Sequence, residues 1–260
     1  MIKDSIEHFK EYWLVNPDSF EKNSRLRFEQ NTRRIDRYTE MYFQSLKSYF
    51  DISEIQSVII TGDSGCNGHA LLLKGNSIAF FCRECFSTEK YSKIFVLHEI
   101  IHALHYHYNA ELFFSNRSEK EELLRQFIVE GVCAYLCKKI LSSNFAEVLW
   151  ADFLEPKEIE NWFIDCRNRK SELIQYCSAN LNANDSEGIF YLKSSDSKLG
   201  SRTGYWISAI TITDIILTVG LSELDCLTLT KRHWETLIRE SFKKGLRESD
   251  SRRFGQADNC

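Results

Sequence analysis

The sequence predicts a mainly helical α+β protein with a small antiparallel or mixed sheet ahead of a histidine-rich helix. Proline is rare, with two residues in 260, and because proline breaks helix interiors this scarcity favours long helices. Residues 56–86 are rich in strand-forming residues and turn signals, whereas most of the chain after residue 88 has helical spacing. Hydrophobic residues make up 43% of the chain, which is enough to bury a sizeable core.

The N-terminal part of the chain is predicted to be helical. Residues 22–50 carry large apolar side chains at mostly helical spacing with charges between them, which is typical of an amphipathic helix. We therefore divide the chain into an N-terminal helical segment, 1–50, and a main domain, 51–260. The front half of this helix is basic, but the whole chain has a net charge of −4, so a solvated helix face is favoured and no nucleic-acid partner is expected. The arginines of the helix are Arg25, Arg27, Arg33, Arg34 and Arg37.

A small sheet is expected within residues 56–86. Two strand-like runs flank Lys74-Gly75-Asn76, a spacing that predicts a hairpin. A third run precedes them and ends at a cluster of turn residues. The predicted strands are 57–61, 69–73 and 77–82.

Helices are predicted for most of the remaining chain. Ser118-Glu119-Lys120-Glu121 has the form of a capping box at a helix start, and Pro156 suits the first turn of the next helix. Residues 181–203 are expected to form a loop, and the polar tail, 247–260, to fray. The predicted helices are 88–108, 118–141, 157–178, 204–219 and 231–246, so active-site helices within 88–141 are followed by a C-terminal helical part, 157–246.

The pentapeptide His98-Glu99-Ile100-Ile101-His102 carries the clearest chemical signal. Residues four apart on a helix lie one turn above each other, so both imidazoles point to one side and can bind one metal ion. Zn²⁺ accepts imidazole nitrogen, and a catalytic zinc site leaves one position open for water. Glu99 is rotated by about 100° from His98, which places its carboxylate beside that water rather than on the metal. The alternative is a helix whose histidines are ordinary core or surface residues.

A hydrolytic zinc site needs a third protein ligand, and Glu130 is the candidate. It is the only charged residue in the apolar stripe of the predicted helix 118–141. An unpaired carboxylate facing a core is unfavourable or becomes protonated, and a zinc ion held by His98 and His102 would remove that cost. A buried ion pair with an arginine or lysine is the alternative. The stripe consists of Leu123, Phe127, Glu130, Ala134, Cys137 and Leu141.

The HExxH helix, followed by a ligand glutamate on a second helix, resembles the gluzincin metallopeptidases, the thermolysin-like zinc peptidases. The segment Glu130-Gly131-Val132-Cys133-Ala134 is similar to the ligand segment of a bacterial gluzincin-like family of predicted Zn-dependent proteases. A later helix start in that family is similar to Gly204-Tyr205-Trp206. The resemblance extends over residues 56–245 and leaves the first fifty residues uninterpreted.

The resemblance implies one catalytic zinc ion bound by His98, His102 and Glu130. It implies that Glu99 acts as the general base and then as the proton shuttle. In gluzincins a downstream tyrosine or histidine often stabilises the oxyanion, and Tyr205 is our candidate for that role. The alternative for Tyr205 is packing, since aromatic residues at helix starts commonly anchor a core.

The resemblance also implies that an edge strand holds the peptide substrate in antiparallel pairing, and we expect residues 77–81 to form this strand.

Two features depart from the family patterns. The gap between His102 and Glu130 is longer than in thermolysin, so a loop at 109–117 must be accommodated. The Gly-x-Met-Glu-Asn segment of aminopeptidases does not occur, which weakens an exopeptidase interpretation.

The nine cysteines are expected to be reduced thiols in a cytoplasmic protein, because their number is odd and no apolar leader precedes them. The longest apolar stretch, 207–219, contains Asp214 and is shorter than the roughly twenty residues that span a bilayer, so no membrane partner is expected. Cys82-Arg83-Glu84-Cys85 is an isolated CxxC for which we expect a structural role. The alternatives are a zinc site formed with Cys66 and His69 and a redox pair, since Cys85 lies near a predicted helix start.

These features predict a zinc-dependent peptidase that uses metal-activated water and a glutamate general base. Its expected partners are a protein or peptide substrate and a protein that inhibits or activates it. Two alternatives stay open: a regulatory metallopeptidase of the type that cleaves phage repressors, and a non-catalytic, metal-stabilised binding protein. The presence of Glu99 favours catalysis, since a structural metal site needs no base.

Overall fold

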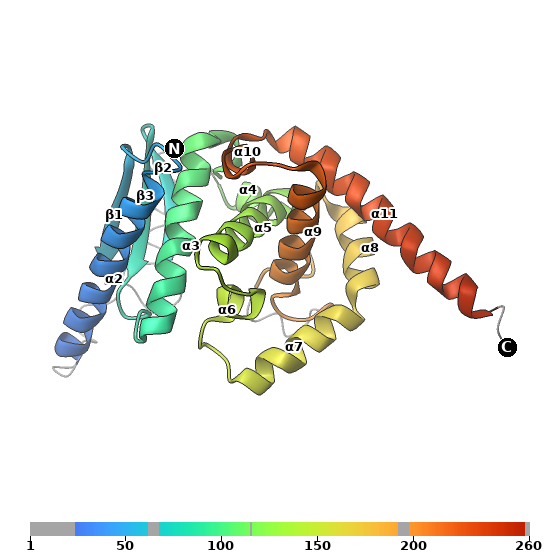
Figure 1. The fold of residues 1–260 in the computed structure, drawn as a ribbon, viewed down its shortest axis with the longest axis horizontal. Coiled ribbons are helices and arrows are strands. Elements are labelled where there is room, and N and C mark those ends of the chain that lie inside the picture. Colours follow the sequence, from blue (N-terminus) through green and yellow to red (C-terminus); the bar gives the residue numbers. More distant parts are fainter. Residues whose placement is uncertain (1–23, 62–67, 115, 192–197, 258–260) are drawn as a thin grey trace. The chain divides into compact units, whose positions relative to one another are not determined.

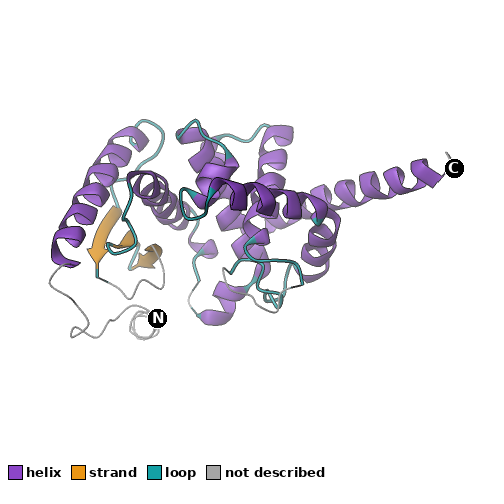
Figure 2. Ribbon diagram, turned by 90° about the horizontal axis from the view of Figure 1, so that it is seen from below, coloured by secondary structure: helices purple, strands orange, loops and turns teal. Residues whose placement is uncertain are grey.

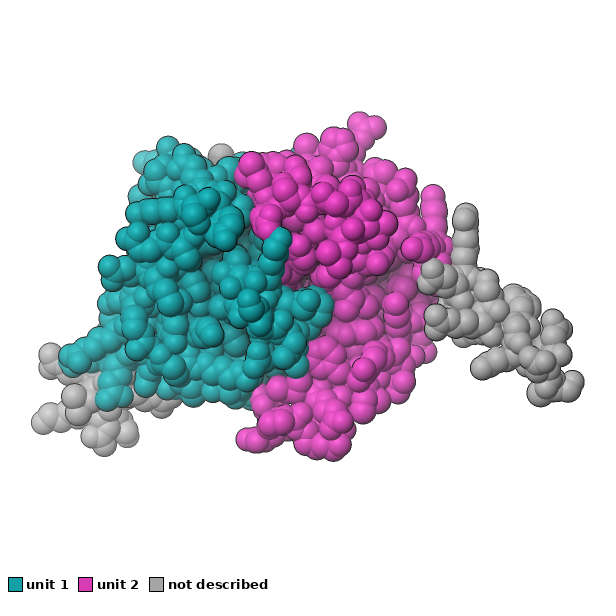
Figure 3. Space-filling view, viewed as in Figure 1, with its two compact units in different colours: residues 1–116, 136–153 teal, residues 117–135, 154–260 magenta. Residues whose placement is uncertain are grey.

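The structure is a computed structural model that describes residues 24–61, 68–114, 116–191 and 198–257. It is mainly helical, and its described residues form one mixed sheet of three strands, which confirms the predicted fold class (Figures 1 and 2). The chain divides into two compact units (Figure 3). Unit 1 consists of Met1–Asn116 and Leu136–Phe153, and unit 2 of Arg117–Tyr135 and Leu154–Cys260.

The sheet of unit 1 confirms the predicted hairpin. Strand β2 (Gly68–Leu73) and strand β3 (Asn76–Cys82) pair in antiparallel fashion, with Leu73 opposite Asn76. Only Lys74 and Gly75 lie between the strands, and both have positive φ angles, 51° and 85°. A two-residue hairpin turn of type I′ needs positive φ at both positions, and glycine meets this need without strain.

The predicted edge strand is wrong. Strand β1 (Ile55–Ile60) pairs in parallel with β3, so the strand order is β1-β3-β2 and residues 77–81 lie in the central strand. The backbone of β3 is hydrogen-bonded to a neighbour on each side and cannot pair with a substrate. The hairpin could be read from local turn chemistry, but the parallel partner comes from a segment that is not adjacent in the sequence.

Helix α3 (Glu89–Tyr108) is the central element of unit 1. Thr88 caps its start by accepting a hydrogen bond from the Tyr91 amide at 3.1 Å. The helix packs against all three strands, and every residue from 94 to 106 is buried. A helix that is buried on all sides has no solvent face, so polar residues within it need a structural or chemical reason.

Helix α2 (Ser24–Leu46) packs along α3 and beside β1. Two of its arginines form ion pairs with Glu89 at the start of α3. Arg34 Nε lies 3.5 Å from Glu89 Oε2, and Arg37 also pairs with this carboxylate. The Tyr38 hydroxyl donates a hydrogen bond to Glu89 at 2.7 Å. Part of the basic character of α2 therefore attaches this helix to the start of α3.

The single helix predicted for 118–141 is interrupted. Helix α4 (Arg117–Glu121) ends before Glu122, and helix α5 (Leu123–Ile140) follows. Ser118 lies within α4 rather than at its N-cap position. The break occurs because the amides of Leu123 and Leu124 donate to the carbonyls of Ala183 and Leu181, at 2.9 and 2.8 Å, instead of to a preceding turn.

The remaining helices follow the prediction in part, and the short helices at 110–112, 145–150 and 223–228 were not predicted. Asn144 caps the start of the helix at 145–150 by accepting a hydrogen bond from the Glu147 amide at 3.0 Å. The helix predicted for 157–178 divides at Arg169, and the last helix continues past Leu246 into the tail that we expected to fray. The bounds are α6 Phe145–Trp150, α7 Pro156–Asn168, α8 Lys170–Asn180, α9 Thr203–Val219, α10 Glu223–Thr228 and α11 Lys231–Ala257, with a short 3₁₀ helix, η2, at Ala110–Leu112.

Unit 2 has a helical core. Helices α8, α9 and α11 pack against one another, and α7 packs against α8 and α9. The described part of the loop predicted for 181–203 begins beside α5 and reaches α9, where the Gly204 amide donates to the Ile189 carbonyl at 2.9 Å. None of the helices that the structure describes combines the length and the apolar character needed to cross a membrane.

The burial of His105 on α3 predicts a pH-dependent stability. This side chain is fully buried, and neither ring nitrogen has a hydrogen-bond partner among the described residues. Burial, and to a smaller extent His102, lowers the pKa of His105 from 6.5 to about 3. Above pH 6.5 the imidazole is neutral in both states. As the pH falls from 6.5 towards 3, the unfolded chain binds a proton that the folded chain does not, so the free energy of unfolding decreases by about 1.4 kcal/mol per pH unit.

We therefore expect His105→Leu to lose about 2 kcal/mol less stability than the wild type between pH 7.5 and pH 5. The difference is measured by urea unfolding of the wild type and His105→Leu at a series of pH values, after a chelator has removed any bound metal. Identical pH dependence of the two proteins would contradict the assigned protonation state.

Candidate metal centre

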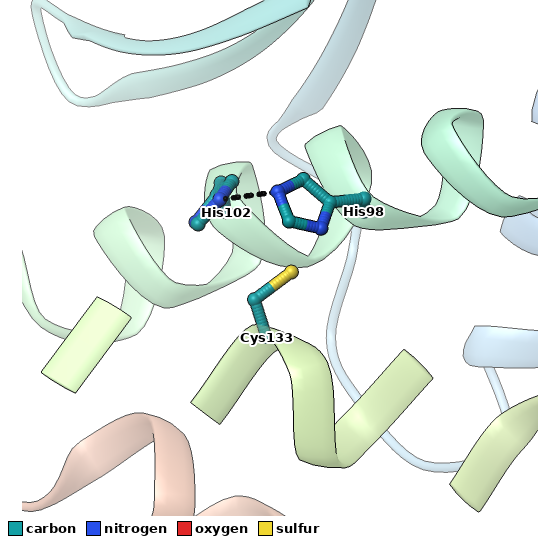
Figure 4. Close-up of side chains that lie close together, drawn as sticks. All are labelled: His98, His102 and Cys133. Atoms are coloured by element: carbon teal, nitrogen blue, oxygen red, sulfur yellow. Dashed lines mark hydrogen bonds between the residues drawn. The ribbon is translucent and has the colours of Figure 1, made fainter. Parts of the chain in front are cut away.

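The structure brings His98 and His102 together on α3, within unit 1. Their Nε2 atoms lie 3.0 Å apart, and the two rings are nearly perpendicular, at 85° (Figure 4). Both side chains are buried, with exposed fractions of 9% and 6%. The His98 ring packs edge-on against Phe95, and the His102 ring stacks on Tyr106, so that neighbouring aromatic rings on the same helix hold both imidazoles in place.

This geometry fits a shared zinc ion. Two Nε2 atoms that face each other at 3.0 Å must share either a proton or a cation, because their lone pairs otherwise repel. For an ion at the usual Zn–N distance of about 2.0–2.1 Å from both nitrogens, the N–Zn–N angle would be about 90–100°, near the tetrahedral value. The donor set of imidazole nitrogens is also one that zinc prefers.

Glu99 lies on a different side of α3 from the two imidazoles. Its side chain is 5% exposed and runs against the first residue of β2. A Cβ atom built on Gly68 would lie 2.6 Å from Glu99 Cγ and 3.0 Å from Glu99 Cδ. The carboxylate is therefore held next to β2, as the rotation of about 100° per helical residue leads one to expect.

Glu130 lies on the part of α5 that belongs to unit 2, where it is half-buried. Its neighbour Gly131 is in backbone contact with α9, since a Cβ atom there would lie 2.5 Å from Ile212 Cγ1 and 2.9 Å from the Ser208 carbonyl oxygen. The glycine that follows Glu130 thus lets α5 and α9 approach closely within unit 2. Its presence has a packing reason that is independent of any metal.

Cys133 is a ligand candidate for which the sequence predicted only a role as a small buried residue. It was not singled out because a cysteine within an apolar helix is usually a small buried residue. Its side chain is fully buried, and its thiol is of the kind that binds zinc; Figure 4 draws it with the two histidines. The signal available in the sequence was its spacing, three residues after Glu130 on the same helix, which places both side chains on one face.

Tyr205 lies at the start of α9, where it is half-buried. Its ring is 5.4 Å from the ring of Phe190, and the Arg202 guanidinium lies 4.4 Å from its centroid. Arg202 has a left-handed backbone conformation, with φ of 56°, that non-glycine residues adopt rarely. The contact with Phe190 agrees with the packing interpretation of Tyr205.

The CxxC segment begins at Cys82, the last residue of β3 in unit 1. Cys82 is buried, Cys85 is half-buried, and the Asn31 side-chain amide donates to the Arg83 carbonyl at 2.7 Å. This bond attaches the segment to α2. Cys66, which the alternative zinc site would need, lies outside the described residues.

Comparison of this chain with protein-family models, with curated proteins and with solved structures gives no match. The resemblance to gluzincins therefore depends on the HExxH motif, the Glu130 segment and the later Gly-Tyr helix start alone.

The contact between Gly131 and α9 predicts a large cost for a small substitution. Gly131→Ala should lower the free energy of unfolding by about 1–3 kcal/mol, because the added methyl group meets backbone and a branched side chain. Gly245→Ala on α11 is the matched control, since its methyl group meets only the far end of Ile174 at 3.2 Å. The control should be neutral or stabilising by up to about 1 kcal/mol. Equal unfolding midpoints for the two variants in urea would refute the close approach of α5 and α9.

Proposed function

We propose that the protein is a zinc-dependent peptidase in which His98 and His102 bind one Zn²⁺ and Glu99 acts as the general base. The observation that carries this proposal is the pair of Nε2 atoms facing each other at 3.0 Å on a buried helix. A pair of buried imidazoles with no chemical role would be unfavourable in a helix core. The glutamate that lies between them in the sequence supplies the carboxylate that the proposed HExxH hydrolase needs as its base.

We further propose that α5 supplies the third ligand. The unit boundary falls inside this unbroken helix, so its end belongs to unit 1. In unit 1, burial raises the pKa of Tyr42, and the Cys137 thiol adds a smaller contribution in the same direction. The Tyr42 hydroxyl donates a hydrogen bond to the Lys93 carbonyl of α3 at 2.6 Å. Glu130 and Cys133 project from the face of α5 that also carries Cys137, two turns and one turn earlier. Glu130 is our first choice because two histidines and a glutamate form the usual set of hydrolytic zinc sites.

The proposed reaction is the hydrolysis of a peptide bond. When bound, zinc supplies a Lewis acid that activates a water molecule and polarises the scissile carbonyl group. The Glu99 carboxylate accepts a proton from the attacking water and delivers it to the leaving amine. The Tyr205 hydroxyl is the proposed donor to the developing oxyanion, with its ring placed by Phe190 and Arg202.

The substrate class in this proposal is a protein or peptide, and a second protein would restrain or activate the enzyme. A cytoplasmic location is part of the proposal, because the chain has nine cysteines and those at 166 and 177 are free thiols. Free thiols suit a reducing compartment.

The two roles assigned to α3 can be separated by substitution. Purified wild-type protein should contain one zinc ion per chain by elemental analysis, and His98→Ala and His102→Ala should lose it. Glu99→Gln should keep the metal but cleave a proteome-derived peptide library at least about 10²-fold more slowly, because it cannot accept the proton. New peptide termini are counted by mass spectrometry. If the wild type contains its zinc ion but cleaves the library no faster than Glu99→Gln does, a non-catalytic metal site is the better description.

The identity of the third ligand can be read from cobalt substitution. If Glu130 binds the metal, Glu130→Gln should weaken zinc binding by about 100-fold or more, which exceeds the usual cost of losing an outer contact. Cys133→Ser should then change affinity little, and the Co²⁺ protein should lack a thiolate charge-transfer band in the near ultraviolet. Cys137→Ser, on the same face, is the control. A strong band that disappears in Cys133→Ser would instead assign the thiolate as the ligand.

A further inference from the structure

We infer that Gly68 is a positioning residue for Glu99: the missing side chain at the start of β2 sets where the Glu99 carboxylate is held. The position is closed on two sides. A Cβ atom on Gly68 would lie 2.6 Å from Glu99 Cγ and 2.7 Å from the Phe80 carbonyl oxygen. Both distances are below the closest approach of carbon to a non-bonded heavy atom, so any other residue here forces a displacement.

The displacement would fall mainly on Glu99. The Phe80 carbonyl belongs to β3, which is the central strand and is paired with β1 on one side and β2 on the other. Moving it would disturb two ladders of hydrogen bonds. The Glu99 side chain, in contrast, packs against β2 and can move by rotation about its single bonds, so it moves at a lower energetic cost than the Phe80 carbonyl.

A small displacement of this carboxylate has a large chemical consequence. Glu99 is 5% exposed and therefore has little free space in which to find another productive position. Misplacement of a reacting group by about 1 Å lowers rates by about 10²-fold. Gly68 thus acts through Glu99 and needs no contact of its own with the substrate. This inference rests on the proposed function insofar as Glu99 is the general base.

The first test compares two glycines of the same hairpin. Gly68→Ala should retain one zinc ion per chain and lower kcat by about 10²-fold, with KM changed less than about threefold, on the peptide that the wild type cleaves fastest in the library. Gly75→Ala is the matched control: it strains a turn with φ of 85° but meets no atom within 4 Å, so kcat should be unchanged. Unchanged kcat in Gly68→Ala, with Glu99→Gln inactive, would overturn the inference while leaving the proposed function intact.

The second test does not depend on activity. A double-mutant cycle in urea unfolding combines Gly68→Ala with Glu99→Ala. Because the truncated side chain no longer occupies the space beside β2, Gly68→Ala should raise the unfolding equilibrium constant about tenfold more in the wild-type background than in Glu99→Ala. Additive effects would show that Gly68 does not hold Glu99. If the wild type cleaves no peptide but the cycle shows coupling, the proposed function fails and the contact stands.

Discussion

The close approach of two imidazole nitrogens on a helix buried on every side is the constraint on which the candidate site depends. From residue 94 to residue 106, α3 has no exposed side chain, yet this stretch contains His98, Glu99, His102 and His105. Burying several ionisable groups in one core helix is costly unless their charges are balanced or their protons removed. A shared divalent cation would balance the charge of a ligand carboxylate and occupy the lone pairs of the two facing nitrogens. His105, which is kept neutral, shows how the same helix deals with an imidazole that has no such partner.

Glycines let backbone and side chains approach in both units. In unit 1, Gly68 gives Glu99 its place against β2, and in unit 2 Gly131 lets α5 pack directly on α9. Gly204 has the same function at the start of α9, where a Cβ atom would lie 2.7 Å from the Phe190 ring. Each glycine adjoins a residue with a proposed chemical role. Gly68 lies against Glu99. In the sequence, Gly131 follows Glu130 and Gly204 precedes Tyr205. The local packing therefore restricts where the functional side chains can be.

Much of the framework could be predicted from local patterns. Helical spacing placed the helices that carry the HExxH motif, Glu130 and Tyr205, and turn chemistry placed the hairpin at Lys74 and Gly75. These patterns succeed because they depend on residues within one or two turns of each other. The break at Glu122 could not be predicted because the amides that follow it donate hydrogen bonds to the carbonyls of Ala183 and Leu181, which are distant in the sequence. Cys133 was passed over because spacing alone does not separate a ligand thiol from an apolar neighbour.

The mainly helical α+β class and the placement of His98 and His102 on one side of a helix could both be predicted from the sequence alone. Both follow from short-range periodicity, which the chain carries in every window of a few turns. Three features became visible only in the packed chain: which strand lies in the centre of the sheet, which side chain lies against Gly68, and the burial of α3 on all sides. These features arise where segments distant in the sequence meet, and a local pattern holds no record of which distant segment fills the space beside it.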